Sequence, residues 1–204
     1  MDLKLLNKRA IITGASNGIG KAIKEALESE GCICTNLDLT TGYDLTSLDD
    51  LERAGLLCFD ADILINNVGG GGTWDAWNYE EVMQKNYGIM ANLTRDFLLK
   101  SKKYGRVITI SSIFGKEKGH NPSFTASKSA QIAFMKTLSG GYSGITFNTI
   151  CPGHIDVGKQ FPYKPEVLGI PKDVANMVTF LCSPLASHIN GATITVDGGE
   201  SYSF

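Results

Sequence analysis

The stretch Thr13-Gly14-Ala15-Ser16-Asn17-Gly18-Ile19-Gly20 decides how this sequence is interpreted. A short β-branched run at residues 9–13 leads into it, and apolar residues recur at helical spacing over residues 19–30 after it. Glycines in such a turn let backbone amides approach a phosphate, and the start of the helix adds partial positive charge at the same place. The stretch therefore predicts a strand, a glycine-rich turn and a helix that bind the pyrophosphate of a dinucleotide.

An acidic residue, Asp38, follows the second expected strand. Dinucleotide-binding proteins place a carboxylate at about this spacing from the turn, where it accepts hydrogen bonds from the adenosine ribose. Its charge would repel the 2′-phosphate of NADP, so NAD(H) is favoured as the cofactor and NADP(H) stays open. The alternative is a glycine-rich turn with a purely structural role.

Short apolar runs alternate with helical patterns along the whole chain. Strands are expected at residues 9–13, 32–39, 62–66, 106–111, 145–151 and 192–196, and helices at 19–30, 47–54, 80–100, 124–138 and 172–181. Strands that are apolar on both faces and alternate with helices are typical of a parallel sheet covered on both sides. We expect an α/β fold of the Rossmann type, with a doubly wound, mostly parallel sheet. No repeat or linker divides the chain, so residues 1–204 are expected to form a single domain.

Composition narrows the class of protein. A net charge of −2 without a basic run argues against a nucleic-acid partner. No apolar stretch is long enough for a membrane span or a signal peptide. Five dispersed cysteines, without paired spacing or a nearby histidine, indicate reduced packing residues and no metal site. A cytoplasmic location follows as an expectation.

The spacing Gly-x-x-x-Gly-x-Gly, at Gly14, Gly18 and Gly20, resembles the first turn of the short-chain dehydrogenase/reductases. Further motifs similar to those of the family follow in order: Asp44-Leu45, Asn66-Asn67-Val68-Gly69, Pro152-Gly153-His154-Ile155 and Asp197-Gly198-Gly199. The resemblance runs nearly end to end. It implies an NAD(P)-dependent oxidoreductase that interconverts an alcohol and a ketone or aldehyde by hydride transfer.

The resemblance also assigns cofactor-binding residues. It implies that the Asp44 carboxylate lies near the adenine and that the Pro152-Gly153 segment lies beside the nicotinamide. Asn17 stands where relatives that prefer NADP often have a basic residue, and Val157 where relatives often have a threonine. The full expected set is Gly14, Ser16, Asn17, Gly18, Ile19, Gly20, Asp38, Leu39, Asp44, Leu45, Asn67, Val68, Gly69, Lys128, Pro152, Gly153 and Ile155.

The family's reaction centre uses an asparagine, a serine and a Tyr-x-x-x-Lys motif, and three of the four residues have counterparts here. Ser112 matches the serine that polarises the carbonyl, and is preferred to Ser111 because adjacent strand residues point to opposite faces. Asn86 is expected to kink its helix and hold a water of the proton relay, the alternative being a helix-surface amide. Lys128 is expected to bind the nicotinamide ribose, the alternative being a solvated lysine.

Phe124 occupies the position of the motif tyrosine. A positioned general acid contributes about 10²- to 10⁴-fold, so turnover is expected to be strongly reduced while cofactor binding persists. Tyr87 and Tyr142 are not spaced to place a hydroxyl over Lys128, and His120 falls in an expected loop. Two origins stay open: a deliberate Tyr→Phe change in a working reductase, which the other three residues favour, or a natural non-catalytic NAD-binding sensor or scaffold.

Size and assembly complete the expectations. The chain is shorter than common family members, with the shortening expected between Asp38 and Asp62 and in a short substrate lid after Pro152. Trp74 and Trp77 border the expected cleft, where they could stack on a sugar ring or serve as packing residues. The resemblance implies a small-molecule carbonyl or alcohol substrate and a homodimer or homotetramer formed through the helices at 80–100 and 124–138.

Overall fold

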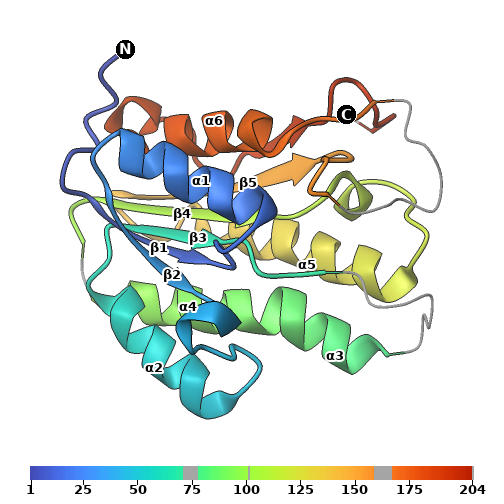
Figure 1. Ribbon diagram of the computed structural model, residues 1–204, viewed down its shortest axis with the longest axis horizontal. Helices are drawn as coiled ribbons and strands as arrows, with labels where there is room; N and C mark the ends of the chain where they lie inside the picture. Colours follow the sequence, from blue (N-terminus) through green and yellow to red (C-terminus); the bar gives the residue numbers. More distant parts are fainter. Residues whose placement is uncertain (71–77, 101, 159–166, 204) are drawn as a thin grey trace.

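The computed structural model describes residues 1–70, 78–100, 102–158 and 167–203. Its centre is a six-stranded sheet with the order β2-β1-β3-β4-β5-β6, in which every neighbouring pair is parallel (Figure 1). The strands are β1 (Arg9–Thr13), β2 (Ile33–Leu37), β3 (Ile63–Asn66), β4 (Gly105–Ile110), β5 (Ile145–Pro152) and β6 (Thr193–Val196). The predicted α/β fold of the Rossmann type is confirmed.

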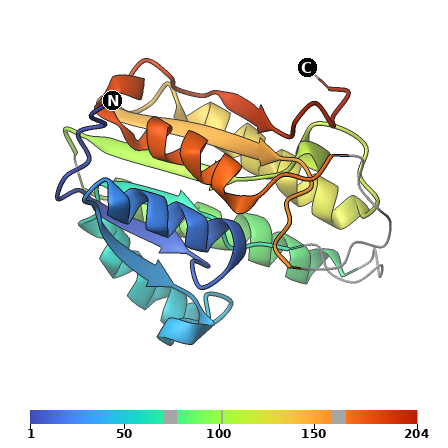
Figure 2. The same cartoon turned by 45° about the horizontal axis from the view of Figure 1, so that its top comes forward.

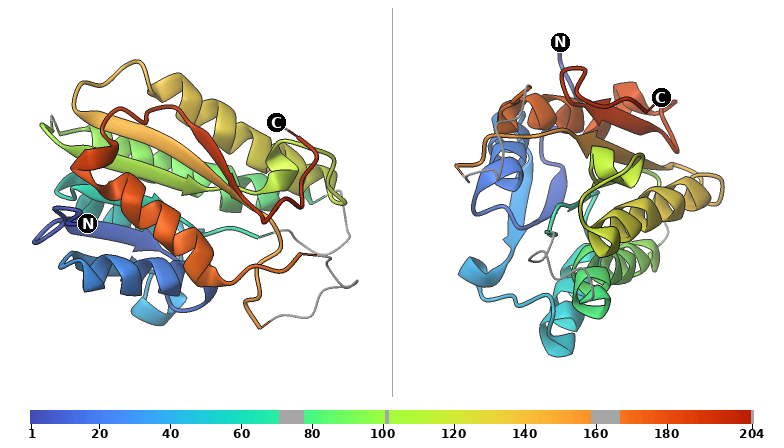
Figure 3. Two further views of the ribbon diagram at one scale, coloured as in Figure 1. Left: turned by 90° about the horizontal axis from the view of Figure 1, so that it is seen from above. Right: turned by 90° about the vertical axis from the view of Figure 1, so that its right-hand side faces the viewer.

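Helices cover both faces of the sheet. One face carries α1 (Gly18–Ser29) and α6 (Pro171–Cys182), which lie side by side, and the other carries α2 (Leu48–Phe59), α4 (Ile89–Leu98) and α5 (Pro122–Leu138) (Figure 3). Helix α3 (Tyr79–Met83) continues into α4 through one π-helical turn, η2 (Gln84–Gly88). Short 3₁₀ turns complete the described elements: η1 (Leu39–Thr41), η3 (Ile113–Gly115) and η4 (Pro184–Ala186). None of the described helices has the length and apolar character needed to cross a membrane.

The pleat of the central strands builds one apolar layer on each face. Successive side chains of a strand point to opposite faces, so in-register neighbours form rows across the sheet. One row packs towards α2 and α4 and consists of Ile11, Leu64, Val107 and Phe147. The opposite row packs towards α1 and α6 and consists of Ile12, Ile65 and Ile108. Burial of both faces explains why the central strands are continuous apolar runs in the sequence.

Strand β2 departs from that pattern because it forms the edge of the sheet. Ile33 is 57% exposed, and the strand is fully buried only at Leu37. Doubly wound sheets of this type commonly have a further strand beyond the second. Here the chain leaves β2 through η1 and enters α2 directly, without a further strand. The missing strand falls between Asp38 and Asp62, where the sequence predicted that the chain is shortened.

Two predicted helices differ in detail. The helix expected at 47–54 extends to Phe59, because Leu51, Ala54 and Cys58 are buried in the apolar layer shared with α4. The helix expected at 80–100 contains the π turn η2, which the apolar periodicity does not reveal. The remaining predicted boundaries agree with the structure within about two residues.

All strands end at the same edge of the sheet, as the common direction of the arrows in Figure 2 shows. The glycine-rich turn after β1, the loop after β3, Ser111 and Ser112 after β4, and the end of β5 therefore lie together. Open α/β sheets bind their ligands at this edge, outside the carboxyl ends of the strands. The fold thus brings motifs that are far apart in the sequence to one place.

Candidate active site

The glycine-rich turn joins β1 to α1 and has no space for a side chain at Gly20. Gly14 and Gly18 have φ angles of +70° and +54°, in the left-handed region that favours glycine. A Cβ atom at Gly20 would lie 2.2 Å from the main-chain oxygen of Gly14. The side chain of Asn67 ties the turn to the end of β3, because its Nδ2 donates to the main-chain oxygens of Thr13 (2.9 Å) and Gly14 (3.0 Å). The turn is therefore built for close approach of a ligand to the backbone.

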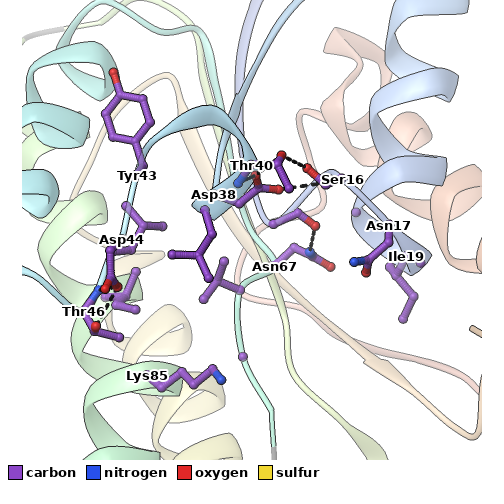
Figure 4. Close-up of a pocket in the computed structure, with 18 of the residues that line it drawn as sticks. Ser16, Asn17, Ile19, Asp38, Thr40, Tyr43, Asp44, Thr46, Asn67 and Lys85 are labelled. Atoms are coloured by element: carbon purple, nitrogen blue, oxygen red, sulfur yellow. Dashed lines mark hydrogen bonds between the residues drawn. The ribbon is translucent and has the colours of Figure 1, made fainter. Parts of the chain in front are cut away.

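Asp38 lies directly after β2, beside this turn (Figure 4). Its carboxylate accepts hydrogen bonds from the main-chain nitrogen of Ser16 (3.0 Å), from Asn36 Nδ2 (2.9 Å) and from both the nitrogen (3.0 Å) and the hydroxyl (2.7 Å) of Thr40. Burial opposes ionisation of Asp38, but these hydrogen bonds outweigh it and lower the pKa of the carboxyl group. A fixed negative charge therefore stands at this end of the site.

The first part of the site is a hollow of about 680 Å³ between the turn and the loop after β2. It contains most of the predicted cofactor-binding set: Gly14, Ser16, Asn17, Gly18, Ile19, Gly20, Asp38, Leu39, Asp44, Leu45, Asn67, Val68 and Gly69. Sequence reasoning missed Thr40, Tyr43, Thr46 and Lys85 in the same lining (Figure 4). Lys85 is the only cation among the described residues of this lining. It lies in the π turn η2, which the apolar periodicity of the sequence does not reveal.

A second hollow, of about 270 Å³, lies at the carboxyl ends of β4 and β5. It contains the remaining predicted residues except Asn86: Ser112, Phe124, Lys128, Pro152, Gly153 and Ile155. The two hollows share Ile19, Asn67, Gly69 and Val157. They are therefore two ends of one groove along the edge of the sheet.

Lys128 is buried in the second hollow and is not a solvated helix lysine. Its Nζ donates to the main-chain oxygen of Ile110 (3.0 Å) and lies 5.6 Å from the centre of the Phe124 ring. The same nitrogen would lie 3.2 Å from a Cβ atom on Gly69, so it reaches the floor of the groove. Burial lowers the pKa of Lys128 to about 8.

Asn86 is fully buried in η2 and is not a helix-surface amide. Its Nδ2 donates to the main-chain oxygens of Val82 (2.9 Å) and Gly70 (3.0 Å), and its Oδ1 accepts from the Gly70 nitrogen (3.0 Å). Gln131 Nε2 donates to the main-chain oxygen of Asn86 (2.7 Å). These contacts hold the loop after β3 against the helix. The helix departs from regular α-helical geometry at Asn86, as expected, and does so through the π turn η2. The predicted contact with a relay water stays a prediction.

The two serines after β4 differ in their surroundings. Ser111 is buried, and its hydroxyl donates to the main-chain oxygen of Lys128 (2.9 Å). Ser112 is partly exposed in the groove, and its Oγ accepts from the nitrogen of Phe114 (3.2 Å). This geometry favours Ser112 as the group that contacts a ligand, because the Ser111 hydroxyl is directed into α5.

Phe124 lies in the first turn of α5, where Asn121 Oδ1 accepts from its main-chain nitrogen (3.0 Å). No tyrosine is present among the described residues that line the second hollow. Tyr87 packs edge-on against Phe134, and Tyr142 packs against Phe147. Neither of these tyrosines supplies the hydroxyl that Phe124 lacks.

Sequence reasoning named His120 as a distant alternative but missed His154. His120 packs against the ring of Phe114 and does not line the hollow, whereas His154 does. The position of His154 in the sequence could have indicated it as a site residue, because it directly follows Pro152-Gly153 at the carboxyl end of β5. Trp74 and Trp77 lie outside the described residues, as do residues 159–166 of the expected substrate lid.

Comparison with known proteins assigns the family. A family profile described as Enoyl-(Acyl carrier protein) reductase matches residues 58–201. The acetoacetyl-CoA reductase of Shinella zoogloeoides is 31% identical, over 97% of this chain and 100% of that protein. The 3-oxoacyl-[acyl-carrier-protein] reductase FabG of Buchnera aphidicola subsp. Schizaphis graminum (strain Sg) is 32% identical, over 97% of this chain and 98% of its own length. The chain belongs to the short-chain dehydrogenase/reductase family.

Members of this family are NAD(P)-dependent oxidoreductases that act on alcohol and carbonyl groups. A solved structure of 7α-hydroxysteroid dehydrogenase, complexed with NADH and 7-oxo glycochenodeoxycholic acid, superposes with a TM-score of 0.85. It is 28% identical, and the match covers 98% of this chain and 96% of that one. The alignment with the Shinella reductase runs over 244 residues, so that relative contains segments that this 204-residue chain lacks.

The buried ammonium group of Lys128 has a consequence for stability. Its pKa is about 8 in the folded protein, against an ordinary value of 10.5 for lysine, so the unfolded chain binds this proton more tightly. Raising the pH from 8 to 10.5 therefore favours folding at this site. We predict that the unfolding free energy of the protein rises over this interval relative to that of a Lys128→Met variant, by at most about 3 kcal/mol. Urea unfolding at both pH values measures the difference.

Lys118→Met is the matched control, because Lys118 is exposed. Its difference from the parent protein should stay constant over the same pH range. A constant difference for Lys128→Met as well would contradict the burial of a charged group at this position.

Proposed function

We propose that the chain binds NAD(H) along the groove and interconverts a ketone and an alcohol at the end formed by Ser112 and Lys128. The observation that carries the proposal is the continuity of the groove from the glycine-rich turn and Asp38 to these two residues. Bound NADH would supply the hydride. Ser112 polarises the carbonyl oxygen, and Lys128 holds the nicotinamide ribose through its buried ammonium group.

The substrate class rests on the names of the relatives. Acetoacetyl-CoA, 3-oxoacyl-[acyl-carrier-protein] and the 7-oxo steroid all contain a ketone. We propose a small-molecule ketone for this chain, with Asn86 as a positioning residue that holds the loop at Gly70. Phe124 has no proton to donate, so turnover in this chain is low.

The choice of NAD(H) over NADP(H) rests on charge. Asp38 is anionic and directly contacts the turn through Ser16, so a 2′-phosphate at this place would meet a negative charge. Asn17 offers no positive charge in return. The cation of the lining, Lys85, comes from η2, and Figure 4 shows it apart from Asp38.

We predict that Asp38→Ala reverses this preference. The parent protein should bind NADH more tightly than NADPH, and the variant should lower the ratio of the two affinities by about tenfold or more, since one close charge–charge repulsion is removed. Fluorescence titration with each cofactor measures the ratio, with the exposed Asp49→Ala as the control. Tighter binding of NADPH than of NADH by the parent protein would contradict the proposal.

Restoring the missing hydroxyl tests the proposed reaction. We predict that Phe124→Tyr raises kcat for ketone reduction by about 10²- to 10⁴-fold, because the variant gains a positioned general acid beside Lys128. NADH oxidation with acetoacetyl-CoA and a panel of ketones measures the gain. Phe134→Tyr, which adds a hydroxyl elsewhere on α5, is the control and should leave kcat unchanged.

The second candidate function is an NAD-binding sensor or scaffold, which Phe124 itself favours. If the chain has this function, we expect it to bind NADH without turnover, even after Phe124→Tyr. The same assay therefore separates the two functions: turnover in the variant supports the reductase, and NADH binding with no turnover on any ketone supports the sensor.

We further propose that the chain is one domain that acts in the cytoplasm as a homodimer or homotetramer. Partly buried aromatic side chains, Tyr87 and Phe134, meet edge-to-face between η2 and α5 and are compatible with an interface there. Sedimentation velocity tests the assembly, and a purely monomeric protein at micromolar concentration would overturn it.

A further inference from the structure

His154 shares the second hollow with Ser112, Phe124 and Lys128. It directly follows the Pro152-Gly153 segment at the end of β5, and its side chain is only 10% exposed. Its ring packs edge-on against Phe114, with 5.9 Å between the ring centres. An imidazole thus stands at the end of the groove where the proposed reaction takes place.

Glu200 fixes this imidazole from the C-terminal turn. One carboxylate oxygen accepts from the main-chain nitrogen of His154 (2.8 Å), and the other is paired with its Nδ1. Gly153 makes room for the contact, since a Cβ atom there would lie 2.4 Å from Glu200 Oε2. The turn is itself held by Asp197, whose carboxylate accepts from the nitrogens of Gly199 (2.9 Å) and Ser201 (2.7 Å).

A carboxylate on one ring nitrogen has a defined chemical effect. It accepts from Nδ1–H and holds the ring in one orientation. Histidine carries a transferable proton near neutral pH, which neither Ser112 nor Phe124 does. The C-terminal turn that supplies Glu200 lies at the carboxyl edge of the sheet (Figure 1). The chain thus has an oriented imidazole in the hollow that also contains the position of the missing tyrosine.

We propose that His154, oriented by Glu200, donates the proton to the carbonyl oxygen in the residual turnover of this chain. As the carbonyl carbon accepts the hydride of NADH, the carbonyl oxygen takes the proton from Nε2. The imidazolium becomes neutral imidazole, and the products are the alcohol and NAD⁺. A proton from water then restores the imidazolium. The inference rests on the proposed ketone reduction and adds the source of its proton.

A cycle of four proteins tests the inference: the parent, His154→Gln, Phe124→Tyr and the double variant. In the parent background His154→Gln should lower kcat for acetoacetyl-CoA or the best ketone by about 10²-fold, the lower bound for a general acid. In the Phe124→Tyr background it should lower kcat less than about threefold, because the tyrosine then donates the proton. NADH affinity should be unchanged in both.

Two further variants test the pairing of His154 with Glu200. Glu200→Gln should lower kcat in the same direction as His154→Gln, and the exposed His188→Gln should have no effect.

The outcomes are distinct. Equal losses of kcat from His154→Gln in both backgrounds would show a structural tie to the C-terminal turn and overturn the inference. Turnover in Phe124→Tyr with none in the parent would also overturn it, while the proposed function stands. Absence of turnover in both would remove the proposed function and this inference together. If His154→Gln does not fold, Glu200→Gln in the two backgrounds decides by the same comparison.

Discussion

The close approach of the main chain at Gly14 to Gly20 is the constraint on which the site depends. A Cβ atom at Gly20 would lie 2.2 Å from the Gly14 oxygen and 2.5 Å from Asn67 Nδ2, so the start of α1, the turn and the end of β3 meet without any side chain between them. This contact fixes where α1 begins and directs its first amides towards the groove. The pyrophosphate end of the site is thereby set by backbone geometry.

The other end of the groove is set by buried polar groups. Lys128 enters from α5, and Asn86 holds the loop after β3 from the π turn. Burying an ammonium group is costly, and its retention beside Phe124 supports the proposed reductase. The paired His154 and Glu200 add a second polar unit at the same end. Hydride and proton transfer require a largely apolar site in which a few polar groups are held in fixed orientations.

The order of elements and the cofactor half of the groove could be predicted because they depend on local patterns. The run around Ile11 and Ile12 and the glycines at Gly14 and Gly20 specify strand, turn and helix by themselves. The resemblance led us to expect an irregular helix at Asn86, but its form as a π turn and the bond of the Asn86 side chain to Gly70, which is distant in sequence, could not be predicted. His154 was missed because its partner, Glu200, lies 46 residues away and only the fold brings them together.

Calorimetric titration of NADH into the parent protein and into Gly20→Ala tests the central claim most directly. If the turn holds the dinucleotide through backbone contact, the parent binds one NADH per chain and Gly20→Ala loses that binding. Gly140→Ala, where a Cβ atom meets nothing within 4 Å, keeps the parent's affinity. Equal NADH affinity in the parent and Gly20→Ala, or no binding by the parent, would contradict the assignment of this groove to the cofactor.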